Sequence, residues 1–486
     1  MDSLWQDLRY GFRILVRNRG FSAVIVFTLA LGIASTTAIL TVVNGVLLRS
    51  LPYDDVERLV WVWGKWPGGD QGSISAPDFE DYRARSQSFQ HLAAFVNVLI
   101  PFNLTEGDGP ERIDGYYITA NFFQALGVQP VLGRTFNVQE EQAGYDRVAI
   151  LSHGLWQRRF GSSPGVIGQS IKINGENFIV VGVMPAGVNM PKAADLWAPL
   201  PFYLPEMKLR YAHQLRPIGR VKPGVTLQQA QAELDLIAAQ LEQQYPESNS
   251  GWTTRLTPLR DQILGDVSKP LLVLLGATAF VLLIACVNVA NLLLARAAAR
   301  RREMAVRTAL GAGRVRLARQ LFTESILLAL IAGVIGIALA FLAVKGLILM
   351  APPGTPRIEE VRLDGAVLVV MLLVSVLTGV LFGLAPVFHT SRRELNESLK
   401  EGGGGRNGTT YSRRLVNMLV AAEVALALVL LIGSGLMIKS FLRLQNVNPG
   451  FDQKNVLTMS IALPASKYAD PVSRATFFQQ AMERVE

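Results

Sequence analysis

The sequence predicts an α-helical membrane protein that carries a large extracytoplasmic α+β domain, built from an α/β core and an inserted β-rich subdomain. Of its 486 residues, 50% are hydrophobic and only 17% are charged, whereas soluble domains average about 25% charged. The apolar residues gather in five long blocks, and residues 49–269, between the first two blocks, show mixed strand and helix patterns. The net charge of +9 is concentrated beside the apolar blocks, which argues against a nucleic-acid interface.

Five blocks are long enough to cross a membrane, because about 20 apolar residues in a helix span the hydrocarbon core. The predicted spans are residues 21–48, 270–295, 321–350, 366–388 and 415–438. Residues 1–20 form a basic amphipathic leader. The first apolar block is too long for a cleaved signal peptide, so it is interpreted as an uncleaved anchor.

The basic residues predict the orientation of these spans. Lysines and arginines accumulate in the leader, in residues 296–320 and in residues 389–414, while residues 351–365 carry more acidic than basic side chains. Cytoplasmic loops are enriched in lysine and arginine. The N-terminus and the two basic loops are therefore predicted to be cytoplasmic. Residues 49–269, the loop 351–365 and the tail 439–486 are predicted to lie outside.

Some residues inside the predicted spans are candidates for helix contacts or function. Ser375, Gly379 and Gly383 are spaced by four, which lets helix backbones approach closely. Four polar residues are functional candidates because polar groups are expensive inside a membrane: Asn288, Asn291, Glu324 and Glu423. Both glutamates lie near basic boundaries, so structural pairing with an arginine and a functional role remain alternatives.

The outer domain has the patterns of an α/β core interrupted by a second unit. Strand-like and helical patterns alternate in five segments: a strand at 57–64, a helix at 76–95, a strand at 213–222, a helix at 224–246 and a strand at 252–259. Thr226 is expected to cap the helix at 224–246. The inserted subdomain is predicted at about 110–210. Within it, Asn174-Gly175 joins two β-rich runs, which is typical of a type I′ hairpin.

The residues of the chain do not suggest a catalytic or metal site. His91, His153, His213 and His389 have no metal-ligand spacing, and the sequence contains no P-loop motif. The alternating Trp61, Trp63 and Trp66 are expected to pack in a strand rather than to line a ligand site. A membrane enzyme is thus disfavoured, and no cofactor is predicted in this chain.

The tail repeats the start of the outer domain. Residues 441–464 resemble residues 47–63 in having Leu-Arg, a turn with proline, an aromatic residue and aspartate, and then a β-rich run, and a helix pattern follows at 469–486. The tract 402–405 is all glycine and is interpreted as a linker. The span 415–438 with the tail 439–486 is therefore predicted to begin a second copy of the unit.

The basic loop 296–320 holds eight arginines, Arg296 to Arg319, which the orientation rule explains. The loop also has a short helical pattern in which Ala305, Val306, Ala309 and Leu310 share one face. Gly311 and Gly313 would end that helix.

With these features on one chain, the sequence resembles the MacB/FtsX type of ABC-transporter permease. The marks are residues 300–330, similar to that family's cytoplasmic loop and third span, together with GRTF (133–136), VAILSHGLWQRRFG (148–161) and VVGVMP (180–185), similar to the MacB-like outer domain. The layout resembles permeases in which two such units are fused. MacB carries its ATPase N-terminal to the permease, whereas here only the leader precedes the first span, so the ATPase is expected to be a separate polypeptide or to be absent.

The resemblance implies a non-catalytic subunit in the bacterial inner membrane that transmits force to its outer domain for efflux or export of a drug, peptide or lipoprotein-type substrate. ATP and Mg²⁺ would bind the partner, a cytoplasmic ABC ATPase dimer. Other implied partners are a second permease unit in cis or in trans, a periplasmic adaptor and an outer-membrane channel. The implied ATPase contacts are Glu303, Met304, Val306, Arg307, Ala309, Leu310 and Gly311. The alternative function is a membrane-anchored ligand-binding sensor or scaffold acting on an extracytoplasmic partner.

Overall fold

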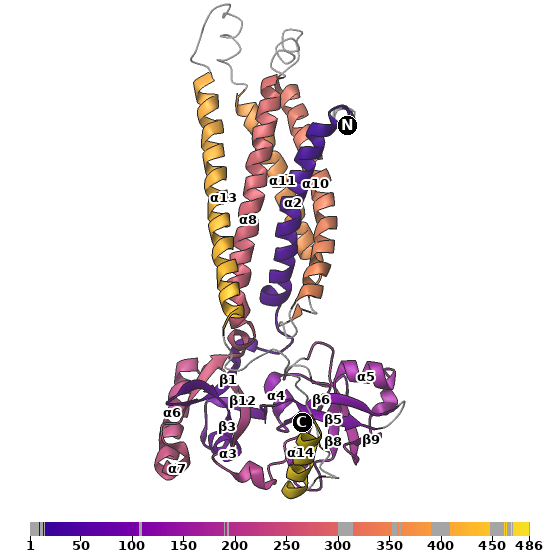
Figure 1. Ribbon diagram of the computed structural model, residues 1–486, viewed down its shortest axis with the longest axis vertical. Helices are drawn as coiled ribbons and strands as arrows, with labels where there is room; N and C mark the ends of the chain where they lie inside the picture. The colour runs from indigo at the N-terminus through magenta and orange to yellow at the C-terminus, as the bar shows by residue number, and fades with distance from the viewer. Residues whose placement is uncertain are drawn as a thin grey trace, which may run out of the picture. The chain divides into compact units, whose positions relative to one another are not determined.

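The structure is a computed structural model that describes the following residues: 9, 13, 15–105, 109–188, 190–191, 194–299, 314–351, 357–358, 361–389, 409–447, 461, 463, 468 and 470–485. The chain divides into two compact units (Figure 1). A helical unit comprises Met1–Ser50 and Leu264–Lys454, and a mixed α/β unit comprises Leu51–Ile263 and Asn455–Glu486.

The helical unit contains long apolar helices. They are α2 (Arg19–Val43) with a π-helical continuation η1 (Asn44–Leu48), α8 (Leu259–Ala299), α10 (Arg314–Met350), α11 (Gly365–His389) and α13 (Thr409–Gln445). Among the described residues, four stretches are long and apolar enough to cross a membrane: Arg19–Leu48, Val267–Arg296, Phe322–Met350 and Asn417–Arg443. In α11 the described apolar stretch is Gly365–Val380. Helix α8 begins at Leu259, well before the predicted span at 270, and contains Pro270.

Small residues let α2 approach α8 and α10 closely (Figure 1). A Cβ placed on Gly32 of α2 would lie 3.2 Å from the Ala285 side chain of α8, and one on Gly336 of α10 would lie 2.8 Å from Ile33 of α2. The Thr36 hydroxyl of α2 also donates to the Thr278 carbonyl of α8 over 3.1 Å. Larger side chains at these glycines would separate the helices.

The mixed unit is built on a sheet of 13 strands. The strands are β1 (Leu59–Trp66), β2 (Gly69–Gly72), β3 (Ile74–Ser75), β4 (Phe89–Val96), β5 (Ile100–Leu104), β6 (Glu111–Ile118), β7 (Leu132–Gly133), β8 (Val148–Leu151), β9 (Ser170–Ile173), β10 (Glu176–Val183), β11 (Leu196–Pro199), β12 (His213–Val221) and β13 (Thr253–Pro258). Their order is β11-β8-β10-β9-β5-β6-β4-β12-β1-β13, and β11 also pairs with β6.

That last pairing closes a barrel of six strands, β6, β11, β8, β10, β9 and β5. The barrel lies within the chain between Ile100 and Pro199, so it occupies most of the predicted inserted subdomain. Strand β4 pairs with β6 and with β12, and it thereby joins the barrel to the remaining strands. We call the strands β1, β3, β4, β12 and β13, with the helices packed on them, the α/β lobe.

Short helices complete the mixed unit. They are η2 (Val56–Arg58), α3 (Ala76–Arg85), α4 (Phe122–Leu126), η3 (Val138–Glu141), α5 (His153–Phe160), η4 (Pro164–Val166), η5 (Pro205–Lys208), α6 (Leu227–Gln244), α7 (Pro246–Asn249) and α14 (Pro471–Val485). Two local predictions are confirmed. Asn174 and Gly175 have φ values of 52° and 87°, as a type I′ hairpin requires, and Thr226 caps α6 by accepting from the Gln229 amide.

The predicted helix over residues 76–95 is wrong in its second half. Helix α3 ends at Arg85, and residues 89–96 form the strand β4. The Glu233 carboxylate of α6 accepts from the Ser86 hydroxyl at 2.9 Å and from the amides of Gln87 and Ser88 at 2.6 and 2.8 Å. These bonds hold the chain in the extended turn that separates helix from strand, and they lower the pKa of Glu233.

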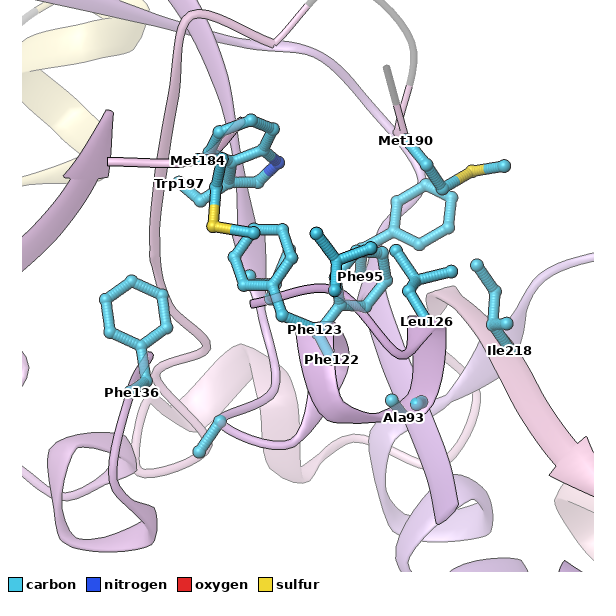
Figure 2. Packing of buried hydrophobic residues seen from close by; sticks show 14 of the residues in the cluster. Ala93, Phe95, Phe122, Phe123, Leu126, Phe136, Met184, Met190, Trp197 and Ile218 are labelled. Carbon is cyan, nitrogen blue, oxygen red and sulfur yellow. The ribbon is translucent and has the colours of Figure 1, made fainter. Parts of the chain in front are cut away.

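A continuous aromatic cluster connects the two halves of the mixed unit. Phe95 of β4 contacts Phe122, Phe122 contacts Phe123, and Phe123 contacts Trp197 of β11, with ring centroids 5.9, 5.7 and 5.2 Å apart. Figure 2 shows these rings together with Met184, Met190 and Phe136. Since offset and edge-to-face aromatic contacts add to area burial, helix α4 joins the α/β lobe firmly to the barrel.

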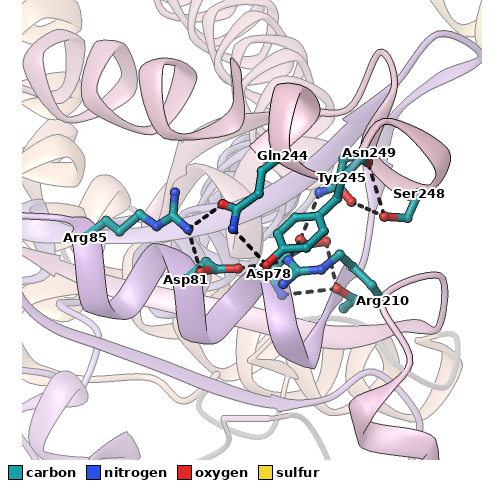
Figure 3. Close-up of polar contacts among 9 residues, drawn as sticks. Asp78, Asp81, Arg85, Arg210, Gln244, Tyr245, Ser248 and Asn249 are labelled. Atoms are coloured by element: carbon teal, nitrogen blue, oxygen red, sulfur yellow. Dashed lines mark hydrogen bonds and ion pairs between the residues drawn. The ribbon is translucent and has the colours of Figure 1, made fainter. Parts of the chain in front are cut away.

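A polar network attaches the segment after the barrel to the α/β lobe (Figure 3). Arg210 pairs with Asp78 and lies 2.9 Å from Asp81, both on α3, and its guanidinium carbon lies 3.7 Å from the centre of the Tyr245 ring. The side-chain amide of Asn249 donates to the Asp78 carboxylate over 2.8 Å. Asp78 is only 5% exposed, so these donors compensate a buried carboxylate.

Candidate functional site

The two connections between the helices and the outer domain meet at one pair of strands. The chain from α2 leads into the start of β1, and the end of β13 continues directly into α8. Strands β1 and β13 are antiparallel, with Val60 opposite Pro258 and Trp63 opposite Arg255. Both connections therefore reach the domain at the same end of a single ladder.

Both connections also contribute to one hydrophobic core. Tyr53 is buried in this core, and Leu51 and Val56 pack partly buried against the core, all from the connection that follows α2. Leu259 is fully buried in the same core and Ile263 packs partly buried against the core, both from the start of α8. We call these residues with the aromatic cluster of Figure 2 the anchor core.

Arg220 of β12 ties the first connection to this core. Its side chain donates to the Asp54 carbonyl over 2.7 Å and to the Ala125 carbonyl, in α4, over 2.8 Å. The residue is 4% exposed. A Cβ on Gly127, which has a φ of 70°, would come within 2.9 Å of the guanidinium, so glycine is needed beside it. Arg220 thus links the α2 connection to the aromatic cluster.

A second set of polar contacts holds the end of α2 within the helical unit. Arg357, in the loop before α11, donates to the carbonyls of Val46, Arg49 and Ser50 over 3.2, 2.7 and 3.2 Å. Asn44 donates to the Asp364 carboxylate over 2.7 Å. Helix ends leave unsatisfied carbonyls, and here the predicted outer loop supplies their donors.

The polar residues predicted inside the spans lie at different depths of burial. Glu324 of α10 is 6% exposed. Asn288 and Asn291 of α8 are partly buried, and the Asn291 side-chain oxygen accepts no hydrogen bond from the described part of the chain. Glu423 lies partly exposed on α13. The structure does not bring these four residues together in one described contact.

The residues predicted to pack helices lie on α11. Ser375 is 1% exposed, and a Cβ on Gly333 of α10 would lie 3.1 Å from its hydroxyl. A Cβ on Gly379 would lie 2.9 Å from Ala329 of α10. Gly383 lies farther along α11, where the surroundings of the side chains are outside the described part. These positions place the α10–α11 contact along the predicted small-residue face.

The predicted ATPase contacts, Glu303 to Gly311, lie outside the described residues. The same holds for the predicted linker 402–405 and for most of the leader. Among the residues that the structure describes, no group of three histidines, cysteines, aspartates or glutamates could hold a metal ion. His213 instead stacks on Trp252, with ring centroids 3.9 Å apart.

Sequence reasoning missed the two arginines that shape the outer domain and the outer loop, Arg220 and Arg357. Arg220 had a visible signal, because it stands in the apolar strand pattern 213–222 on the same side as Ile218. Its partners, two backbone carbonyls far away in the chain, have no sequence signature. Arg357 had no such signal.

Glu141 forms a pH-sensitive contact between η3 and the α/β lobe. Its carboxylate accepts from the Ala120 amide over 2.7 Å and lies 3.9 Å from Arg83 of α3. Burial raises its pKa above the ordinary value of 4.5, and these donors only partly oppose that shift.

The raised pKa gives Glu141 a definite contribution to the pH dependence of stability. The folded state holds this proton at pH values where the unfolded chain has lost it. The contribution of Glu141 to the free energy of unfolding is therefore largest below the unfolded pKa, and it falls as pH rises through the folded pKa. Glu141→Gln should remove this contribution while keeping an acceptor for Ala120. Urea melts of both proteins from pH 4 to 7 would measure this, and the variant should gain stability relative to the parent as pH rises. A difference in free energy of unfolding that stays constant with pH would contradict the prediction.

Two family models and a solved structure are similar to parts of this chain. A family model described as the MacB-like periplasmic core domain matches residues 22–237, and one described as the FtsX-like permease C-terminal domain matches residues 275–395. The periplasmic region of MacB from Actinobacillus actinomycetemcomitans is a solved structure similar to this chain, with 14% identity and a TM-score of 0.33, covering 47% of this chain and 97% of that one.

Curated relatives are longer than this chain. The pyoverdine export ATP-binding/permease protein PvdT of Pseudomonas entomophila is 23% identical over 400 residues, covering 80% of this chain and 58% of the relative. The macrolide export ATP-binding/permease protein MacB of Burkholderia lata is 27% identical over 286 residues, covering 57% of this chain and 39% of the relative. With apolar helices, a large α+β domain and both permease family models in the expected order, the chain belongs to the MacB/FtsX-type ABC transporter permeases.

Proposed function

We propose that this chain is the non-catalytic permease subunit of an exporter and that it transmits movement from a separate cytoplasmic ABC ATPase dimer to its outer domain. The observation that carries the proposal is the shared anchor. Both helices that flank the domain enter one strand pair, β1 and β13, and one anchor core. A displacement of α2 relative to α8 would act directly on that ladder.

The dense packing of the anchor core favours movement of the whole core over local deformation within it. The anchor core is dense with fully buried aromatic side chains, and close-packed interiors transmit strain. Arg220 and Arg357 hold the chain on both sides of residue 50, because one binds the Asp54 carbonyl and the other binds carbonyls at the end of α2. The proposed output is movement of the α/β lobe and the barrel together, as one body.

The proposed setting is the bacterial inner membrane, with the N-terminus and the loop 296–320 cytoplasmic and the large domain outside. The names of the relatives refer to export of pyoverdine and macrolides. We propose a cargo of the same broad kind, a drug, peptide or lipid-linked product taken up outside the inner membrane. A second permease unit, in cis or in trans, would complete the assembly, with a periplasmic adaptor and outer-membrane channel as further proposed partners.

The test is the coupling of ATP hydrolysis to this chain. The full chain and an ABC ATPase encoded in the same gene neighbourhood would be purified together in nanodiscs. Arg307→Gln, Leu310→Asp and Glu303→Lys should each lower the stimulated ATPase rate about thirtyfold, because loss of a central interface residue costs about 2 kcal/mol. Arg302→Gln removes the same charge as Arg307→Gln from the same loop and should have little effect.

Two results would reject the proposal. In one, the ATPase would neither co-purify with this chain nor change its rate. In the other, Arg302→Gln and Arg307→Gln would lower the rate equally. That result would mean that the loop attracts the ATPase by its net charge and not by contacts of particular residues. A chain that binds an outer ligand normally but ignores the ATPase would support the sensor or scaffold alternative.

A further inference from the structure

Arg216 occupies an unusual place on the inner face of the α/β lobe. It lies in β12 opposite Phe95 of β4, and its guanidinium carbon lies 5.1 Å from the centre of the Trp63 ring on β1. Tyr116 of β6 contacts Phe95 edge-on, with centroids 5.6 Å apart. The guanidinium therefore lies near the Trp63 ring of β1, and the Phe95–Tyr116 pair lies on the neighbouring strands β4 and β6.

Arg216 differs from other arginines of the outer domain, such as Arg134 and Arg158, in having no carboxylate partner among the described residues. Among the described residues no carboxylate acts on the charge of Arg216, and its buried Nε atom has no hydrogen-bond partner there. Burial lowers the pKa of Arg216, with only the Tyr116 phenol acting in the opposite direction. By contrast, Arg134 and Arg158 have carboxylates at 2.7 and 3.1 Å.

A half-buried guanidinium without an anion is unfavourable, and an oxyanion would relieve this. When its plane stacks on an indole, the edge of the guanidinium still offers N–H groups for two parallel hydrogen bonds to a carboxylate or phosphate. The aromatic side chains around it favour an apolar body on the same ligand. The neighbouring Arg255, opposite Trp63 on β13, adds positive charge to the same row of the sheet.

We propose that Arg216, Trp63, Phe95 and Tyr116 form a binding site for an oxyanion carried on an apolar group. The ligand class comprises carboxylates and phosphate monoesters with an aryl or alkyl substituent. The site lies entirely within the outer domain. Its existence does not depend on coupling to an ATPase, so failure of one proposal leaves the other intact.

The test is binding of two small probes to the full chain in nanodiscs, followed by ligand-observed NMR and calorimetric titration. Both 3-phenylpropionate and phenyl phosphate carry the required groups, and a difference between them identifies the preferred oxyanion. The neutral 3-phenylpropionamide controls for partition into lipid. We expect saturable binding of at least one anion. The amide should bind at least about tenfold more weakly than that anion, as expected for loss of one charged hydrogen-bonding group.

Variants test the role of the guanidinium. Arg216→Gln should weaken binding about tenfold or more, and Arg216→Lys should also weaken it because lysine keeps the charge without the planar fork. Arg147→Gln removes an arginine whose side chain is 58% exposed and should bind like the parent. Thermal midpoints would show that each variant is folded, and the lysine variant remains informative if the glutamine variant is not.

The proposal is overturned if neither anion binds saturably, if the amide binds as tightly as the acids, or if the folded Arg216 variants bind like the parent.

Discussion

Gly115→Ala is expected to destabilise the outer domain by about 3 kcal/mol or more, because the barrel cannot close around an added methyl group. A Cβ at Gly115 of β6 would lie 2.2 Å from the Leu196 carbonyl oxygen and 2.8 Å from the Phe102 ring. The nearest atom belongs to backbone that pairs with β6, since Leu196 lies opposite Gly115 in the β6–β11 ladder. Relief of the clash requires these strands to separate.

Gly154→Ala is the matched control for this prediction. Gly154 lies in α5, and the atom nearest to a Cβ added there would be the Ser152 hydroxyl oxygen, at 3.9 Å. The same chemical change should there be neutral or stabilise the helix by about 0.5 kcal/mol. Thermal and urea melts of the full chain, followed by tryptophan fluorescence, would measure both. Equal effects at the two glycines would show that the β6–β11 closure does not limit stability.

Arg220→Met is expected to destabilise the outer domain by about 3 kcal/mol and to weaken coupling to the ATPase. Methionine fills part of the space but leaves the carbonyls of Asp54 and Ala125 without their buried donor, and each unsatisfied buried group costs about 1–3 kcal/mol. The α2 connection would then lose its polar tie to α4. If movement passes through this tie, ATPase stimulation should fall at temperatures where the variant is folded.

The control for this experiment is Arg147→Met, which removes an arginine paired with Glu176 at 3.3 Å at the surface. Exposed pairs contribute at most about 1 kcal/mol, so both stability and stimulation should stay near those of the parent. A folded Arg220→Met variant with normal stimulation would show that Arg220 has only a structural role. A variant with parental stability would contradict the contribution assigned to its two hydrogen bonds.

The candidate site was only partly accessible to sequence reasoning. The basic loop 296–320 was identified from charge and a short apolar face, and its role stays a prediction because the ATPase contacts lie outside the described residues. The anchor core could not be predicted, because Tyr53, Trp197 and Leu259 come together from parts of the chain about 60 to 210 residues apart. Arg216 and Arg220 look alike in sequence, and only their surroundings distinguish them.

The sequence by itself determined the features that depend on neighbouring residues. Long apolar blocks predict membrane helices since each helix satisfies its own backbone in lipid, Asn174-Gly175 predicts a hairpin by its access to positive φ, and Thr226 predicts a helix start by its hydroxyl. The tertiary structure alone decided that residues 89–96 form a strand and that β6 closes a barrel with β11. Strand pairing joins residues far apart in the chain, so the partner decides the conformation, and a helix-compatible run such as Leu92-Ala93-Ala94 becomes the strand between β12 and β6.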